Sequence, residues 1–321
     1  MLAGFAGVTD PGRRRRRNED AYVCEPPLFA IADGMGGAQA GEVASGLAAA
    51  VLEEATGDER GEERVASLIQ EANRRVFQRS NEDAATSGMG TTMTVALLDN
   101  TDGTIAFGHV GDSRAYRVRG GELEQLTDDN SLVGELVRSG RLSPEEAESH
   151  PQRSVITRAL GTEPDVDVDT FTVEAEEGDI YLLCSDGLTD MTSTHEILAA
   201  VEASNDLDDA ARGLVSAANE GGGEDNITVV LFQIAGESED LGETAQLPVA
   251  VEDDEDTLSP LDAVPAVDTA VIPAAVVEEH LQQVEAAAPG RAEPRRRILP
   301  LVLLVVLLVA LIALALWGLT R

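Results

Sequence analysis

The sequence predicts an α+β domain of antiparallel sheets and packed helices, followed by an acidic tether and an apolar terminal segment. Three observations lead to this prediction. Strand-like and helix-like segments come in blocks instead of alternating, which favours layered antiparallel sheets over a doubly wound α/β fold. The composition changes after Ala235, where a region begins that is rich in acidic residues, Pro and Ala and has no aromatic residue. The third observation is an uncharged, apolar run at 298–319.

The first block of the domain consists of strands and then helices. Residues 5–9 and 28–32 are short apolar runs of strand length. Residues 42–55 and 63–79 are longer and predict two helices. In the second of these, apolar side chains recur at helical spacing, at Val65, Leu68, Ile69, Ala72 and Val76.

The remaining blocks repeat this arrangement of strands followed by helices. Strand-like runs in the middle of the domain stand at 92–98, 104–110, 115–119 and 123–126, and a helix is expected at 131–139. The last block predicts strands at 170–173 and 179–184, helices at 194–203 and 208–220, and a final strand at 227–234.

Acidic residues occur in five separate short motifs along the chain. The motifs are Asn18-Glu19-Asp20, Asp33-Gly34-Met35-Gly36-Gly37, Gly111-Asp112-Ser113-Arg114, Ser185-Asp186-Gly187 and Glu224-Asp225-Asn226. Two of them directly follow an apolar strand-like run, which ends at Ala32 or at Cys184. A carboxylate at the end of a buried strand is costly unless a positive charge meets it. The set therefore predicts a site for a multivalent cation. Hard oxygen ligands without a His or Cys cluster favour magnesium or manganese over zinc.

The overall charge excludes some classes of partner. The formal net charge is -36 and every basic residue is Arg, which argues against non-specific nucleic-acid binding. Cys24 and Cys184 both stand in apolar strand-like runs, so we expect two buried, reduced thiols in a cytosolic domain. Residues 1–8 lack the basic lead of a signal peptide.

Residues 298–319 predict a transmembrane helix. At about 1.5 Å per residue this run is about 33 Å long, enough for a bilayer core of about 30 Å. Three arginines, at 295–297, stand immediately before it. By the positive-inside rule we expect a single-pass tail anchor, with the domain at 1–235 in the cytoplasm. Residues 236–297 are then a disordered linker rich in acidic residues, Pro and Ala.

Seven short motifs, taken in order, carry a family resemblance. They are NEDAY at 18–22, DGMGG at 33–37, GTT at 90–92, GDSRAY at 111–116, ITRALG at 156–161, SDGLTD at 185–190 and EDNITVV at 224–230. In this order they resemble the metal-dependent serine/threonine protein phosphatases of type 2C, most closely the bacterial branch that works opposite membrane Ser/Thr kinases. The resemblance covers residues 3–235. It implies a central β-sandwich of two antiparallel sheets flanked by helices, with the metals at one end.

The resemblance also implies a role for most of the acidic motifs. Asp33 would bridge two magnesium or manganese ions, and the carbonyl of Gly34 would join one of them. Asp186 and Asp225 would complete the metal pair. Glu19 and Asp20 would act as ligands directly or through metal-bound water. Two ions about 3.5–4 Å apart generate a hydroxide nucleophile near neutral pH and neutralise the phosphoryl oxygens.

A third metal site and a flap are implied in the same way. Asp112 and Asp190, together with Asp186, match a third site, and Ser154 falls where some bacterial members add a ligand. Residues 131–153 correspond to the flap beside the site. The alternative for Asp112 and Asp190 is that they are turn residues bound by backbone N–H groups.

Arginines at 13–17 offer the cation that a phosphate needs. In the family one Arg lies four residues before the Glu of the acidic pair, which here is Arg15. A guanidinium can bind two phosphate oxygens at once. The other four arginines form a solvated basic loop, which an anionic lipid or an acidic substrate could attract.

The general acid is where this chain departs from many members of the family. Many eukaryotic members carry a His at the position of Met35, which cannot donate a proton. His109 lies in a predicted strand and is expected in the core, and His150 in the flap is the candidate worth testing. Protonation by metal-bound water is the simpler expectation. A Cys-x5-Arg motif is absent, so a phosphocysteine route is unsupported.

The sequence thus predicts a tail-anchored, magnesium- or manganese-dependent phosphatase. Its expected substrates are phosphoserine and phosphothreonine in proteins, among them membrane Ser/Thr kinases. One alternative is a catalytically weak metal-binding module that senses phosphoproteins. The other is a metal-dependent hydrolase of small phosphoesters or diesters.

Overall fold

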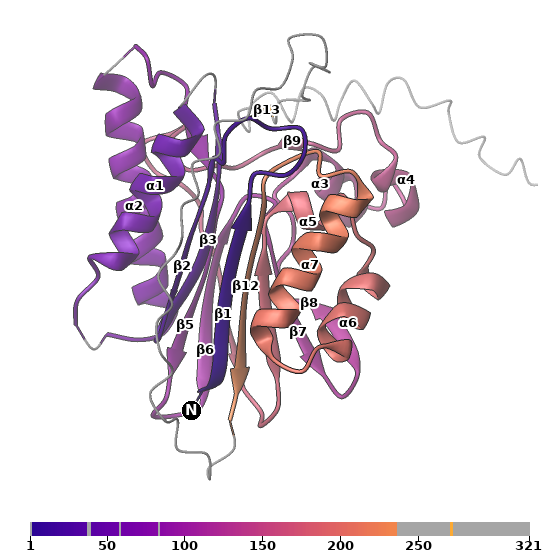
Figure 1. Cartoon of the computed structure of the whole chain (residues 1–321). Helices are drawn as coiled ribbons and strands as arrows, with labels where there is room; N and C mark the ends of the chain where they lie inside the picture. Colours follow the sequence, from indigo (N-terminus) through magenta and orange to yellow (C-terminus); the bar gives the residue numbers. More distant parts are fainter. Residues whose placement is uncertain (1, 37–39, 58, 83, 236–269, 272–321) are drawn as a thin grey trace, which may run out of the picture. The chain divides into compact units, whose positions relative to one another are not determined.

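The computed structural model describes residues 2–36, 40–57, 59–82, 84–235 and 270–271 (Figure 1). Two antiparallel sheets form the centre of the domain. The first has the strand order β1 (Leu2–Asp10), β12 (Ile227–Ile234), β11 (Ile180–Cys184), β7 (Arg114–Arg119) and β8 (Glu122–Gln125). The second has the order β10 (Asp169–Glu174), β6 (Thr104–Val110), β5 (Met93–Asp99), β3 (Leu28–Met35) and β2 (Asp20–Glu25), with β4 (Gly90–Thr91) paired to β3.

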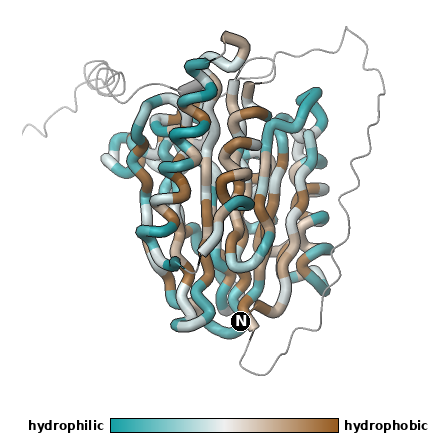
Figure 2. The backbone as a smooth tube through the Cα atoms, turned by 90° about the vertical axis from the view of Figure 1, so that its left-hand side faces the viewer, coloured by the Kyte–Doolittle hydropathy of each residue, from teal (hydrophilic) through white to brown (hydrophobic). Residues whose placement is uncertain are grey.

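Aromatic side chains from both sheets meet between them. Phe29 of β3 stacks on Phe232 of β12 with ring centroids 4.4 Å apart. Tyr181 of β11 stacks on the same Phe232 at 5.1 Å and lies 6.0 Å from Phe107 of β6. All four side chains are buried. The two sheets therefore pack face to face as a sandwich, and Figure 2 shows hydrophobic residues recurring along its strands.

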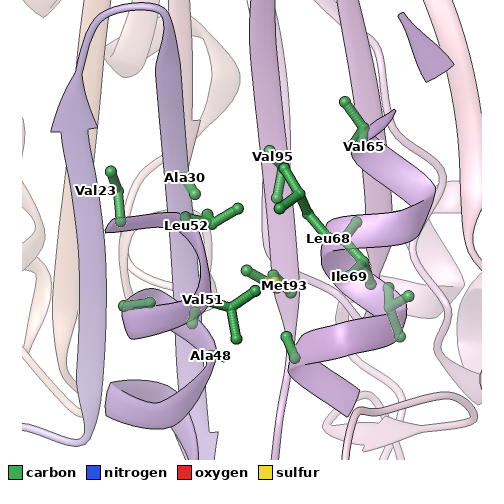
Figure 3. Packing of buried hydrophobic residues seen from close by; sticks show 14 of the residues in the cluster. Val23, Ala30, Ala48, Val51, Leu52, Val65, Leu68, Ile69, Met93 and Val95 are labelled. Carbon is green, nitrogen blue, oxygen red and sulfur yellow. The ribbon is translucent and has the colours of Figure 1, made fainter. Parts of the chain in front are cut away.

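Helices cover the outer face of each sheet. On the second sheet lie α1 (Ala40–Glu53) and α2 (Glu62–Glu82), as Figure 1 shows. Figure 3 shows the apolar side chains of this layer, which come from both helices and from the strands beneath them: Val23, Ala30, Ala48, Val51, Leu52, Val65, Leu68, Ile69, Met93 and Val95. On the first sheet lie α6 (Thr194–Ala203) and α7 (Leu207–Gly221), whose buried side chains pack with those of β11 and β12.

A segment beside the sandwich carries short elements. These are α3 (Leu132–Arg138), α4 (Pro144–Glu148) and β9 (Val155–Ile156), and α5 (Asp186–Thr189) directly follows β11. The helix α4 begins at a capping box, in which Ser143 and Glu146 each accept a hydrogen bond from the other's backbone. Ser193 and Glu196 form the same motif at the start of α6.

The layered arrangement of antiparallel sheets and helices is confirmed, and most predicted elements lie within two or three residues of their expected bounds. The strand β2 was not predicted, because polar residues open it and it has no long apolar run. The helices α4 and α5 were not predicted either, since helices of four or five residues are too short to show a period.

Little of the C-terminal region belongs to the described residues. In the predicted linker, β13 (Ala270–Val271) pairs in parallel with β9. The predicted transmembrane segment at 298–319 lies outside the described residues and stays a prediction. Among the residues that are described, none of the helices is both long and apolar enough to cross a membrane.

Candidate active site

The strand register brings the acidic motifs to one end of the sandwich. Asp20 at the start of β2 and Asp33 near the end of β3 are direct partners in the antiparallel ladder. Asp186 follows the end of β11, and Asp225 precedes β12, the neighbouring strand. Asp112 stands two residues before β7. Residues far apart in the sequence therefore meet where these strands begin or end.

Burial and mutual repulsion both act on these carboxylates. Burial raises the pKa of Asp33 well above its ordinary value, and repulsion from Asp20, Asp186, Asp225 and Asp112 raises that pKa further. The pKa of Asp186 is raised in the same way, first by burial and then by its acidic neighbours. Such a cluster favours protons or a multivalent cation at its centre.

Asp20 is held at one oxygen and leaves the other without a partner. Its Oδ2 accepts hydrogen bonds from Ser185 Oγ at 2.9 Å and Thr228 Oγ1 at 2.5 Å. Burial raises its pKa to about 6 despite these bonds. Its Oδ1 is buried and lacks a hydrogen-bond partner, as does Oδ1 of Asp186. Buried acceptors without a partner are rare, and an ion or water would satisfy them.

Gly34 sits where two backbone segments approach each other. A Cβ at this position would lie 2.2 Å from the carbonyl oxygen of Gly41 and 2.5 Å from that of Glu19. Gly34 N–H donates to that Glu19 oxygen at 3.1 Å, and Ser45 Oγ of α1 donates to it as well. Because position 34 has no side chain, the backbone of β3 can approach the backbone of α1 and of the acidic pair closely. Gly37, at the end of the same motif, lies outside the described residues.

Arg15 points into the site. Its Nη2 lies 2.7 Å from Asp225 Oδ2, and its side chain is 19% exposed. Burial raises the pKa of Asp225, and the neighbouring Arg15 opposes that rise. The sequence reasoning placed Arg15 at the phosphate, and the structure places it beside one of the clustered carboxylates.

The proposed third-site residues line a cavity next to the cluster. Asp112, Asp186, Asp190 and Ser154 all line this cavity of about 640 Å³, which lies against α3, α4 and α5. Burial raises the pKa of Asp112 to about 7. Arg153, next to Ser154, lies 3.3 Å from Asp190 Oδ2. The flap-side residues and the acidic residues thus line the same cavity.

Asn226 is a positioning residue whose role was not predicted, although it stands in one of the acidic motifs. Its side chain is 4% exposed. Its Oδ1 accepts from Glu19 N–H at 2.8 Å, and its Nδ2 donates to the carbonyls of Pro11 and Arg17 at 3.0 and 2.8 Å. The signal in the sequence is an amide directly between an acidic residue and a buried strand. Ser185 and Thr228, which hold Asp20, were also missed.

The histidines and Met35 occupy different environments. His109 is buried as predicted; its Nδ1 lies 2.9 Å from Thr94 Oγ1, and burial lowers its pKa. His150 follows α4, and its Nδ1 accepts from Gln152 N–H at 3.2 Å. Met35 is buried with Ile156 in a small apolar cluster.

The residues present fit divalent cations with oxygen ligands. Among the described residues, no three carboxylate, imidazole or thiol side chains are arranged to hold an ion directly. The buried carboxylate oxygens without partners, and the mutual repulsion that raises the pKa of Asp33, nevertheless favour a cation or protons at this point. Magnesium keeps several of its waters, so a site that binds partly through water meets its requirements.

Comparisons with known proteins agree with this geometry. Residues 13–220 match the family described as protein phosphatase 2C. The chain is 41% identical over 263 residues to the serine/threonine protein phosphatase PstP of Mycobacterium tuberculosis, covering 81% of this chain and 50% of that protein. It is also 41% identical over 237 residues to the serine/threonine phosphatase stp of Listeria monocytogenes, covering 70% of this chain and 93% of that protein. The chain thus spans about half the length of PstP.

Solved structures give the same result. The crystal structure of the M. tuberculosis serine/threonine phosphatase PstP/Ppp is similar with a TM-score of 0.69 and 40% identity, covering 74% of this chain and all of that one. The catalytic domain of a PstP in complex with two manganese ions has a TM-score of 0.66 and 38% identity, covering 73% of this chain and 98% of that one. With its sandwich and its clustered acidic motifs, the chain belongs to the protein phosphatase 2C family.

Proposed function

We propose that this chain hydrolyses phosphoserine and phosphothreonine in proteins with magnesium or manganese as cofactor. The observation that carries the proposal is the meeting of five acidic motifs and one arginine at one end of the sandwich. Relatives at 41% identity are named serine/threonine phosphatases. A solved PstP catalytic domain, 38% identical to this chain, is in complex with two manganese ions.

The clustered residues divide into two proposed groups of ligands. Asp33 would bridge two ions, joined by the Gly34 carbonyl. Asp186 and Asp225 would complete the pair, and Glu19 and Asp20 would act directly or through water. A third ion would take Asp112, Asp186, Asp190 and Ser154. The Oδ1 atoms of Asp20 and Asp186, buried and without a hydrogen-bond partner, support a role for both residues as ligands.

The pair of ions, when bound, supplies a hydroxide nucleophile and neutralises charge on the phosphoryl oxygens. Arg15 would bind and orient the phosphate through its guanidinium. Asp225 holds that guanidinium at 2.7 Å, so it is oriented before substrate arrives. Asn226 binds the backbone of Glu19 and of Arg17, and so fixes the position of Arg15 relative to Glu19.

The leaving serine or threonine oxygen needs a proton, and Met35 has none to give. His109 is fully buried inside the sheet, with a lowered pKa. We therefore propose that water in the site provides this proton, with His150 as the side chain to test against it.

The proposed location follows from the sequence alone. A tail anchor at 298–319 would hold the domain at the cytoplasmic face of a membrane through the linker at 236–297. Confinement there would raise its effective concentration toward membrane-bound Ser/Thr kinases. Membrane fractionation and protease added outside intact cells test this topology. Recovery of the full chain in the soluble fraction, or digestion of the domain from outside, would contradict it.

The activity is tested by phosphate release from a phosphothreonine peptide, with manganese, magnesium or EDTA. We expect release that depends on the metal and is lost in Asp33→Asn, while the exposed, matched control Asp165→Asn retains it. Turnover of a nucleotide or phosphodiester in preference to the peptide would favour a small-phosphoester hydrolase. Peptide binding without turnover would favour a phosphoprotein-sensing module.

A further inference from the structure

We propose that the loop between β1 and β2 selects substrates in which acidic residues flank the phosphorylated residue. The selecting groups are the guanidinium groups of Arg13, Arg14 and Arg16, called the basic rim below. This inference rests on the proposed function and adds the class of protein sequence on which the site acts. The loop is the indigo segment that follows β1 at the upper end of the domain in Figure 1.

The backbone of this loop is fixed against the active site. The N–H groups of Arg13 and Arg14 both donate to the carbonyl of Gly223, at 2.8 and 3.1 Å. Gly12 has a φ of +73°, and a Cβ there would lie 2.2 Å from the carbonyl oxygen of Asp225. The loop therefore packs directly on the segment that carries Asp225.

Both ends of the loop are tied to the same side chain. Asn226 Nδ2 donates to the carbonyls of Pro11 and Arg17, one on each side of the basic rim. The residue that aligns Glu19 thus also aligns the rim. A cation on a fixed backbone loses less conformational freedom when it binds a ligand than one on a mobile loop.

The arginine side chains divide into inward and outward groups. Arg15 is 19% exposed and bound to Asp225. The three rim side chains are exposed, and no ion pair joins them to a carboxylate within the described parts of the chain. By contrast, arginines such as Arg114, Arg119 and Arg158 each have a close carboxylate partner. The rim is therefore available to an anion from outside.

The surrounding charge makes this arrangement selective. The chain carries a formal net charge of -36, so an acidic substrate is repelled by most of its surface. The three arginines of the basic rim stand next to Arg15, so they offset this repulsion at the place where the phosphate would bind. An extended peptide advances about 3.3 Å per residue, so a peptide that runs along this loop from a phosphate on Arg15 would bring its next one to three positions to the neighbouring arginines. Asp or Glu at those positions would meet guanidinium groups.

The experiment compares two phosphothreonine peptides of equal length on the full chain with manganese. One has Asp and Glu around the phosphothreonine, and the other has Gln and Ser. The test variant is Arg13→Gln/Arg14→Gln/Arg16→Gln. The matched control, Arg60→Gln/Arg74→Gln/Arg212→Gln, removes three positive charges from α2, from α7 and from the segment before α2.

We expect the wild type to favour the acidic peptide by about three- to tenfold in kcat/KM, mainly through KM. This preference should weaken as ionic strength rises. The rim variant should lose the preference and the control variant should keep it. No turnover of either peptide by the wild type would instead count against the proposed function.

Two outcomes overturn the inference while leaving the proposed function intact. One is turnover of both peptides by the wild type without preference. The other is an unchanged preference in the rim variant. If the rim variant instead loses turnover only of a phosphopeptide anchored on phosphatidylserine vesicles, and not on phosphatidylcholine vesicles, the rim binds lipid headgroups and the inference is wrong.

Discussion

The side chain of Asn226 accepts a hydrogen bond from the backbone N–H of Glu19 at 2.8 Å, across 207 residues of sequence. This bond joins the start of β12 to the loop before β2. Through its amide group Asn226 also holds the carbonyl oxygens of Pro11 and Arg17. One buried side chain thus sets the position of the loop that carries Arg15 relative to the carboxylates.

Replacing Asn226 with Ala should therefore lower both stability and activity. The change removes three part-buried hydrogen bonds, to the N–H of Glu19 and to the carbonyls of Pro11 and Arg17, and each loss costs about 0.5–1.5 kcal/mol. We expect a lower free energy of unfolding in urea and weaker manganese binding. The control is Asn81→Ala, which removes an exposed amide bound to Phe77 within α2. Equal effects of the two variants would contradict the role assigned to Asn226.

A substitution at Gly34 tests the close approach of β3 and α1. A Cβ there would meet the carbonyl of Gly41 at 2.2 Å, so Gly34→Ala should destabilise the domain by about 1–3 kcal/mol. Gly46 lies in the interior of α1, with open space around its Cβ position. Gly46→Ala should accordingly stabilise by about 0.5–1 kcal/mol. Thermal unfolding of both variants in EDTA measures these changes in stability. A stabilising effect of Gly34→Ala would show that a Cβ at position 34 does not clash with the carbonyl of Gly41.

The strands and the acidic residues could be predicted because both leave local signals in the sequence. Apolar runs mark β3 and β11, and their acidic ends mark Asp33 and Asp186. Ser185 and Thr228 left no such signal, because their role depends on Asp20, which is distant in the sequence. Asn226 stands between an acidic residue and a strand, but its bond to Glu19 is equally long-range and could not be predicted from that position. The strand β2 was missed for a similar reason. It becomes a strand by pairing with β3, not through its own apolar character.

Arg15 and its neighbours provide a test of register in the arginine run. Arg15→Ala should reduce kcat/KM for a phosphopeptide by about ten- to hundredfold, because a charged bidentate contact contributes about 1.5–3 kcal/mol. Manganese binding should change less than substrate binding. Arg212→Ala is the matched control, since Arg212 is exposed on α7 and its ion pair with Asp209 spans 3.8 Å. If Arg14→Ala loses kcat/KM strongly while Arg15→Ala keeps the wild-type value, the phosphate-binding arginine is misassigned.

The stability of the metal-free protein should rise as the pH falls from 7.5 to about 5. In the folded state burial raises the pKa of Asp20 to about 6 and that of Asp112 to about 7, against an ordinary value of 3.8. Between these limits the folded chain holds more protons than the unfolded chain, so acidification favours folding. His109 acts in the opposite direction below pH 6.5, because burial lowers its pKa, but it is one group against several carboxylates.

Manganese should reverse this dependence, because the bound ion requires the deprotonated carboxylates and is lost on acidification. We therefore expect the unfolding temperature to rise from pH 7.5 to 5.5 in EDTA and to fall over the same range in manganese. Asp33→Asn removes one of the clustered charges, so its metal-free form should melt higher than the wild type at pH 7.5 and depend less on pH. Thermal unfolding across this range, with each cofactor condition, gives the measurement. A metal-free wild type that melts lower at pH 5.5 than at pH 7.5 would show that the carboxylates do not repel one another as their positions imply.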